Sequence, residues 1–178
     1  ALHVDDDVLT VDFAGTSGQV QGAINSTLSF AKSAIYFAIR SIMTEDVPNN
    51  AGFFRPIKAI AEPGSLVNPL PPGACAARGV TGFRVIDAIT GALAKAVPDR
   101  IRAPGEGGTT SYSIAGYDSY GNYSQFREEV MGCFGAVENR EGIDGLANPP
   151  ANISNAPIED IENSAPIRVE RYELVADS

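Results

Sequence analysis

The longest apolar stretch of the chain, residues 28–43, is the feature that most restricts its fold. Its apolar residues recur every three or four positions, the spacing that gathers side chains on one face of an α-helix. We therefore predict a helix over residues 26–43, capped by Asn25 or Ser26 and buried on more than one side. The predicted buried positions are Leu28, Phe30, Ala31, Ala34, Ile35, Phe37, Ala38, Ile39 and Ile42.

Polar residues within this stretch argue against a membrane crossing. Lys32, Ser33, Arg40 and Ser41 interrupt it, so it falls short of the roughly 20 apolar residues that a bilayer requires. The acidic residues 1–7 contain no basic segment followed by an apolar one, and so do not resemble a signal peptide. We expect a cytoplasmic protein with no membrane partner.

Length and charge set further bounds. A chain of 178 residues with 44% apolar content fits a single domain over residues 1–178, with a hydrophobic core of its own. Thirteen basic against 22 acidic residues give a net charge of -9, and Lys and Arg form no cluster. Most of the surface would repel a polyanion, so we expect no nucleic-acid partner.

Further periodic segments predict structure in the first half. Strands are expected at residues 8–13 and 57–61, with a proline-rich loop after the second one. A second helix is expected over residues 81–97, with Thr81 as its cap and Pro98 as its end. A glycine inside this helix, Gly91, indicates close packing there.

The second half is expected to be β-rich. Two strands joined by a short turn are predicted at residues 111–117 and 123–130. A long surface loop at residues 138–166 is expected to hold one helical turn, and strict alternation over residues 167–174 predicts a final, half-buried strand. The predicted fold class is α+β (mixed α/β), with two main helices packed on a mixed sheet.

The chain offers few ligands for a metal. A catalytic zinc normally takes about three protein ligands from His, Cys and carboxylates. The single histidine, His3, stands beside three aspartates, which we interpret as a solvated acidic tail. Cys75 and Cys133 are interpreted as reduced, buried thiols rather than nucleophiles. No metal site is predicted, and the catalytic residues stay unknown.

Four smaller features fit both a structural and a binding interpretation. The glycine-rich run at residues 105–110, with Glu106 inside it, is either a tight turn or a backbone site for an anion. Arg55 is either a charge-pairing residue or an anion clamp. Asp12 and Asn25, at the ends of predicted elements, suit turns and caps as well as a site. The residues alone leave these alternatives open.

Phrases spread over nearly the whole chain resemble the B-type subunits of the hydantoinase/oxoprolinase family. Residues 12–25, DFAGTSGQVQGAIN, are similar to the family pattern DFxGTxxQVxGxxN. The phrases NAGFFRP and EPGSLVNP, at residues 50–56 and 62–69, follow two further patterns. ARGVTGFR and GEGG, at residues 77–84 and 105–108, resemble one branch of the family. The end of the chain matches at residues 154–159 and 166–178.

The resemblance implies a two-component enzyme. An A-type partner uses ATP to activate a small cyclic amide or ketone, and the B-type subunit completes hydrolysis or carboxylation. It also implies a divalent metal held by an N-terminal region rich in His and Asp, which is absent here, so that no cofactor is expected in this segment. The chain thus resembles an excised segment, inactive by itself, that joins the rest of its own B-type subunit and the A-type subunit in an oligomer.

Two alternatives remain beside this interpretation. One is a segment of a related acetone or acetophenone carboxylase subunit, and the other is a subunit-assembly module without catalytic function, which docks neighbours through its acidic surface and the loop at residues 138–166. The matching phrases imply a substrate-binding role for seven residues. These are Asp12, Thr16, Asn25, Asn50, Arg55, Arg78 and Glu106.

Overall fold

A computed structural model describes residues 1–130 and 132–174 of the chain. The fold is α+β, with two main helices beside a mixed sheet, which confirms the predicted class. The chain forms two compact units, Ala1–Ala103 with Val137–Asn139, and Pro104–Ala136 with Arg140–Ser178. Each is described by itself, and the single-domain interpretation stays a prediction. The last four residues of the final family phrase lie outside the described residues.

The first unit is built on a three-stranded sheet in the order β1-β2-β3. Strand β2, Val8–Asp12, pairs in parallel with β3, Ile57–Ile60, and in antiparallel with β1, Leu2–Asp5. Both predicted strands of this half are confirmed. The predicted acidic tail is wrong in one respect, because His3 lies in β1 opposite Thr10. In β1 the backbone amides and carbonyls form hydrogen bonds with β2, whereas in a solvated tail they would bond only to water.

Helix α1, Leu28–Ser41, is the predicted central helix. Its face of Ala31, Ala34, Ile35 and Ala38 is buried, as the three- and four-residue spacing predicts. The predicted cap is wrong, because Thr27 occupies that position and its hydroxyl accepts a hydrogen bond from the Phe30 amide at 3.3 Å. The Asn25 side chain instead forms hydrogen bonds with the backbone of two loops.

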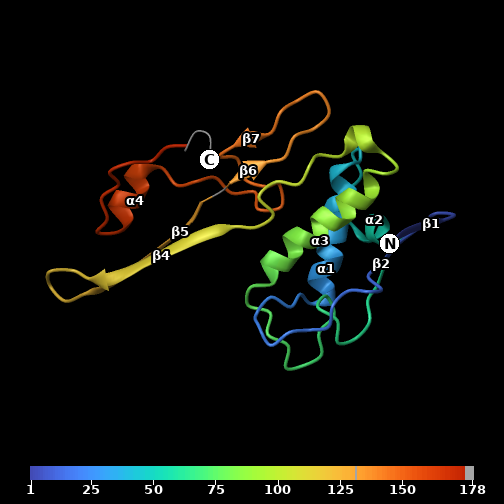
Figure 1. Ribbon diagram of the computed structural model, residues 1–178, viewed down its shortest axis with the longest axis horizontal. Helices are drawn as coiled ribbons and strands as arrows, with labels where there is room; N and C mark the ends of the chain where they lie inside the picture. The colour runs from blue at the N-terminus through green and yellow to red at the C-terminus, as the bar shows by residue number, and fades with distance from the viewer. Residues whose placement is uncertain (131, 175–178) are drawn as a thin grey trace. The chain divides into compact units, whose positions relative to one another are not determined.

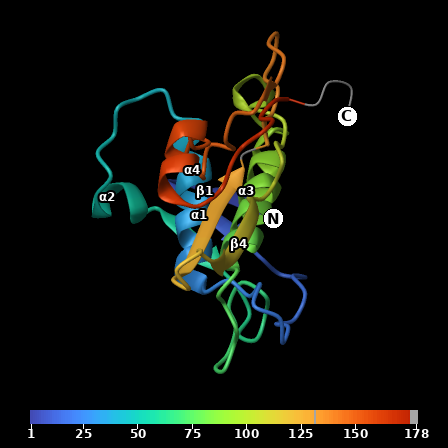
Figure 2. The same ribbon diagram turned by 90° about the vertical axis from the view of Figure 1, so that its left-hand side faces the viewer.

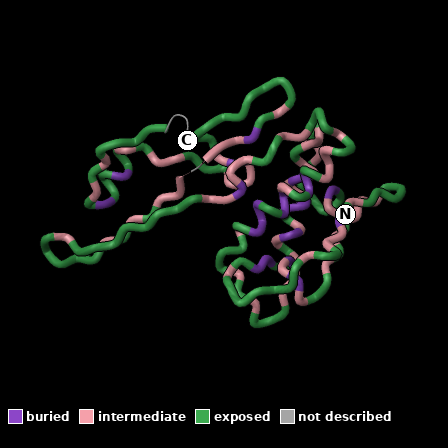
Figure 3. Tube along the Cα trace, viewed as in Figure 1, coloured by how far each residue is buried: buried purple, intermediate pink, exposed green. Residues whose placement is uncertain are grey.

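Helix α3, Arg78–Leu93, packs against α1, and the two lie side by side in Figures 1 and 2. It begins three residues before the predicted cap, Thr81, so that prediction is wrong. The Thr81 hydroxyl lies within the helix and donates to the carbonyl of Ile24 at 2.5 Å instead of capping. A short 3-10 turn, Pro98–Arg100, follows. Buried residues gather on these two helices in Figure 3. The core is completed by Val11, Val67, Val85, Ile86 and Ile89.

The close helix contact lies at Gly82 rather than at Gly91. A Cβ atom on Gly82 would collide with the ring of Phe30 in α1, whereas a Cβ on Gly91 would meet nothing within 4 Å. The prediction for Gly91 is therefore wrong. Only a residue without a side chain lets the helices approach at Gly82.

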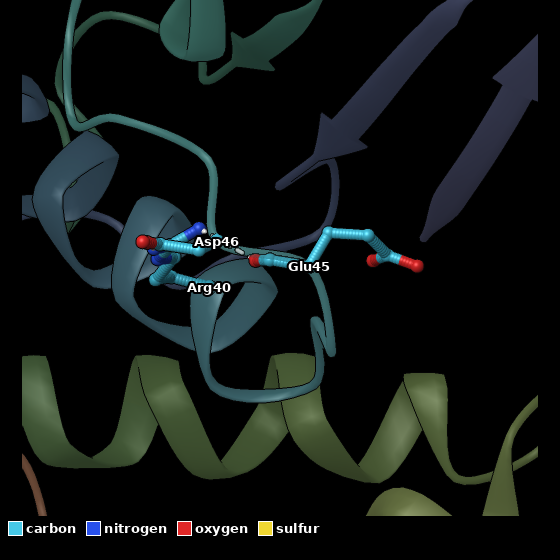
Figure 4. A network of polar contacts seen from close by, with 3 residues as sticks. All are labelled: Arg40, Glu45 and Asp46. Carbon is cyan, nitrogen blue, oxygen red and sulfur yellow. Dashed lines mark hydrogen bonds and ion pairs between the residues drawn. The ribbon is translucent and has the colours of Figure 1, made fainter.

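The connection from α1 to β3 contains a short helix, α2, Ala51–Phe54, which the sequence did not predict. Arg40, near the end of α1, fixes the start of this connection, as Figure 4 shows. Its guanidinium donates to the Glu45 carbonyl at 3.3 Å and lies 3.4 Å from the Asp46 carboxylate. Because the Asp46 side chain is fully exposed, this ion pair contributes little to stability.

The second unit contains the predicted hairpin. Strand β4, Thr110–Tyr117, pairs in antiparallel with β5, Tyr123–Val130. In the turn, the Asp118 carboxylate accepts hydrogen bonds from Asn122 and from the Tyr120 amide, and these bonds lower the pKa of Asp118. A smaller pair follows, β6, Cys133–Phe134, with β7, Ile143–Asp144.

The end of the second unit differs from the prediction. Helix α4, Ile158–Ser164, confirms the helical turn expected in the long loop. The predicted final strand is wrong, because residues 167–174 have no strand structure and are mostly exposed. The Val169 amide instead donates to the Glu162 side chain at 2.9 Å. Across residues 1–130 and 132–174, no helix has the length and apolar character needed to cross a bilayer.

The two glycines of α3 give a matched test of helix packing. We expect Gly82→Ala to lower the free energy of unfolding by about 1 kcal/mol, because overpacking costs about 1–3 kcal/mol and exceeds the gain in helix propensity. Gly91→Ala has space for its methyl group and should raise the free energy by about 0.5–1 kcal/mol. Urea unfolding measures both, and equal effects would contradict the assigned helix contact.

Candidate functional site

Two loops of the first unit meet where strands β2 and β3 end. We call residues 13–27 and 61–77 the loop pair; they appear in blue and green below α1 and α3 in Figure 1. Because β2 and β3 are parallel, both loops leave the same edge of the sheet, where open α/β sheets usually bind ligands. Backbone bonds join them, from Leu66 to Ser17 at 2.9 Å and from Ser26 to Leu66 at 2.8 Å.

The side chain of Asn25 holds the loop pair together. It is completely buried. Its oxygen accepts from the Val20 amide at 2.8 Å, and its nitrogen donates to the carbonyls of Val20, Gly22 and Ala74 at 2.8, 3.0 and 2.8 Å. Since both polar atoms are engaged within the chain, the geometry gives Asn25 a positioning role. Whether Asn25 also contacts substrate, as the family phrases imply, stays a prediction.

Three other predicted site residues lie around the loop pair. Asp12, at the end of β2, accepts a bond from the Ala14 amide at 2.9 Å and so forms the turn that its position suggested. Thr16 follows in the same loop and is half-buried. Arg78 begins α3, with its guanidinium 5.5 Å from the centre of the Phe30 ring. This places Asp12, Thr16, Asn25 and Arg78 at one end of the unit.

Asn50 and Arg55 are not brought to that end. They flank helix α2, which precedes β3, and Pro56 beside them accepts a backbone bond from Leu9 at the start of β2. Asn50 caps α2, since its side chain accepts from the Gly52 amide at 2.9 Å. Arg55 is exposed. The structure therefore separates these two residues from the loop pair by the length of the strands.

Glu106 belongs to the second unit and forms what we call the Glu106 clasp, residues 105–110 with 132–133. One carboxylate oxygen accepts from the Thr110 hydroxyl at 2.7 Å, and the other accepts from the Gly132 amide at 2.8 Å. A Cβ on Gly105 would collide with the Cys133 carbonyl, and one on Gly132 would collide with Glu106. The glycines thus allow close backbone packing, which favours the turn interpretation of this run over the anion site.

The structure reveals a polar residue beside the clasp that the sequence did not indicate. Asn148 is 2% exposed, and neither atom of its amide has a hydrogen-bond partner among the described residues. Its Cγ would lie 3.6 Å from a Cβ placed on Gly105. An Asn before two prolines predicts only a turn, and the Ala151 amide does donate to the Asn148 carbonyl at 2.9 Å.

Two partly buried side chains of opposite charge, Arg102 and Asp87, lie in the first unit. Burial lowers the pKa of Arg102, and the charge of Asp87 in α3 acts in the opposite direction. The Asp87 side chain is 11% exposed and also lies 3.7 Å from Arg84. An opposite charge offsets the cost of burying a carboxylate, so we interpret this pair as structural.

Metal-ligating side chains are scattered over the part of the chain that the structure describes. Within residues 1–130 and 132–174, no group of three or more His, Cys, Asp and Glu side chains could hold an ion. Cys75 and Cys133 form no disulfide and are half-buried, so they are less enclosed than the sequence analysis expected.

Comparisons with known proteins place these features in a family. A family model described as Hydantoinase B/oxoprolinase matches residues 1–178. A Pseudomonas protein (strain NS671), provisionally named as the B-type subunit of a D-/L-hydantoinase, is 39% identical over 97% of this chain and 30% of its own length. The 5-oxoprolinase of Dictyostelium discoideum is 25% identical over 92% of this chain and 12% of its own length.

A solved structure has the same fold. The ATP-dependent caprolactamase of Pseudomonas jessenii superposes with a TM-score of 0.85 at 24% sequence identity. The match covers 99% of this chain and 32% of that one. The chain therefore spans about a third of the length of this structure and less than a third of the relatives named above.

Replacement of the buried amide tests the role of Asn25. In Asn25→Asp, a carboxylate would face three carbonyl oxygens, so the pKa of the new group should rise above its unfolded value of about 3.9. Because the new carboxyl group would bind its proton more tightly in the folded than in the unfolded state, the variant loses stability as the pH increases and the group ionises. We expect a loss of about 3 kcal/mol near neutral pH and a smaller loss below about pH 4.

Urea unfolding at several pH values measures this difference. Asn49→Asp, an exposed loop position, is the matched control and should change stability by less than about 0.5 kcal/mol at every pH. A similar, pH-independent effect of both substitutions would show that Asn25 does not hold the loops.

Proposed function

Because this chain belongs to the hydantoinase B/oxoprolinase family, we propose that it is a segment of the B-type subunit of an ATP-dependent cyclic amide hydrolase. The observation that carries the proposal is the family match over all 178 residues, supported by a common fold over 99% of the chain. The enzyme would work in an oligomer with an A-type subunit that uses ATP, which implies a cytoplasmic location.

The chemistry favours hydrolysis over carboxylation. The named relatives are a hydantoinase subunit and a 5-oxoprolinase, and the structural neighbour is a caprolactamase. Hydantoin, oxoproline and caprolactam share a cyclic amide whose carbon is a poor electrophile because nitrogen donates electrons to the carbonyl. ATP-dependent activation of that carbonyl by the partner subunit would prepare it for attack by water.

The described residues do not fit the divalent metal that the family resemblance implies. They bring no three potential ligands together, and the single histidine lies in β1 with its side chain exposed. We therefore assign no step to a metal held by this segment. Its contribution is a rigid scaffold in the first unit and packed loops in the second that present side chains to the substrate.

An assembly role is the second candidate, and one observation favours it. Three tyrosines at the tip of the β4–β5 hairpin are exposed, with Tyr117 at 75%, Tyr120 at 90% and Tyr123 at 60%. Tyrosine is enriched in protein interfaces because it offers a large apolar ring with a polar end. This role is compatible with a catalytic subunit, since a hydrolase of two components must also bind its partner.

Turnover by the assembled enzyme tests the proposed function. The full-length subunit that carries this segment, mixed with its A-type partner and ATP, should hydrolyse at least one of hydantoin, oxoproline and caprolactam. Omission of ATP or of the partner should reduce the rate to background, and residues 1–178 alone should show none. Ring opening is followed by chromatography of the amino acid product.

Two results would contradict the proposal. Hydrolysis by residues 1–178 alone without ATP would show that this segment holds a complete active site. A stable complex with the partner that hydrolyses none of the three amides would favour the assembly role. A heat-treated sample of the same proteins controls for spontaneous ring opening.

A further inference from the structure

The amide of Asn148 is a buried group with unused hydrogen-bonding capacity. The side chain is 2% exposed, and its oxygen and nitrogen both lack a partner among the described residues. Folded proteins pair nearly all of their buried polar groups, because an unpaired one has lost its bonds to water without replacement. Such a residue is therefore expected to bind something that the described residues do not supply.

The polar groups of the Glu106 clasp beside Asn148 are bonded to other parts of the chain, and none of them bonds to the Asn148 amide. Both Glu106 oxygens accept bonds from Thr110 and Gly132, and the Cys133 carbonyl accepts from the Glu106 amide at 3.4 Å. The Gly132 carbonyl accepts from the Gly145 amide at 2.7 Å. The polar groups of the Glu106 clasp that lie beside Asn148 thus have hydrogen-bond partners of their own.

The chemistry of a primary amide decides which ligand matches. Its oxygen accepts and its nitrogen donates on the same edge, so the full complement is a group with one donor and one acceptor side by side. A cyclic amide has this arrangement, because the ring holds N–H and C=O on the same side. An ordinary peptide group is trans and points them in opposite directions, and a simple anion or cation matches only one of the two atoms.

We propose that Asn148 binds the cyclic amide substrate through two hydrogen bonds, one from its nitrogen to the ring carbonyl and one from the ring N–H to its oxygen. This inference rests on the proposed function and adds to it a substrate-binding residue. Because Asn148 is 2% exposed, the proposal requires the turn at residues 148–151 to move away from Gly105 when the ring binds. A backbone bond of 2.9 Å from the Ala151 amide to the Asn148 carbonyl closes that turn. The competing occupant is a buried water.

Methylation of the ring nitrogen gives a direct test, because it removes one of the two bonds. Binding of caprolactam, oxoproline and their N-methyl derivatives to the full-length subunit is measured by calorimetry. The wild-type subunit should bind at least one unmethylated ring at least tenfold more tightly than its N-methyl derivative. Asn148→Leu should lose this preference, whereas the control Asn163→Leu, at an exposed position of α4, should keep it.

Kinetics and stability separate a binding role from a structural one. In the complete enzyme with ATP, Asn148→Leu should raise KM at least tenfold with a smaller change in kcat. Its melting temperature without ligand should be unchanged or higher, because two unpaired polar atoms are removed. If Asn148→Leu does not fold, Asn148→Asp keeps the shape and replaces the donor, and it should also weaken binding at least tenfold.

Three results would overturn the inference. They are an unchanged KM in Asn148→Leu, a preference for the unmethylated ring that persists in that variant, and the absence of any preference in the wild-type subunit. An unchanged KM with a lower melting temperature would assign the site to a buried water only. These results leave the proposed function standing as long as the wild-type enzyme hydrolyses a cyclic amide, and only the failure of that reaction rejects the function.

Discussion

The buried side chain of Asn25 is the interaction on which the first unit depends. Strands β2 and β3 are parallel, so the chain must cross from one end of the sheet to the other through α1, and the two loops at the carboxyl ends have no ladder of their own. Asn25 joins its own loop to Ala74 in the other, and Thr81 binds Ile24 next to it. The starts of α1 and α3 are fixed together by these two contacts.

Local periodicity was sufficient to predict the elements that are buried on one face. The central helix agrees with the sequence because side-chain spacing reports burial directly. The hairpin, whose first strand is exposed along its length, was predictable from its turn residues instead. The predictions that were wrong depended on distant partners. Asn25 and Thr81 have the chemistry of helix caps but bind other segments, and Gly82 rather than Gly91 faces Phe30. The alternation of residues 167–174 could not show that no strand would pair with them.

The candidate site was less predictable than the fold. Family phrases located the loops, yet the structure uses Glu106 and Asn25 to hold the backbone and places Arg55 away from the loop pair. Asn148 was not predictable, because its lack of a partner among the described residues is a property of its surroundings and leaves no pattern in the sequence. The chain belongs to the hydantoinase B/oxoprolinase family. We propose that within such an enzyme this segment supplies scaffold and substrate contacts, and that activation of the substrate occurs in groups outside it.

The most direct test of this division of labour is the metal stoichiometry of residues 1–178. Calorimetric titration of the chain with zinc and with manganese should show no one-to-one binding, because the described side chains bring no ligand set together. The full-length subunit titrated in the same way gives the comparison. One tightly held equivalent in residues 1–178 that survives dialysis would contradict the division, since this segment would then hold the hydrolytic centre itself.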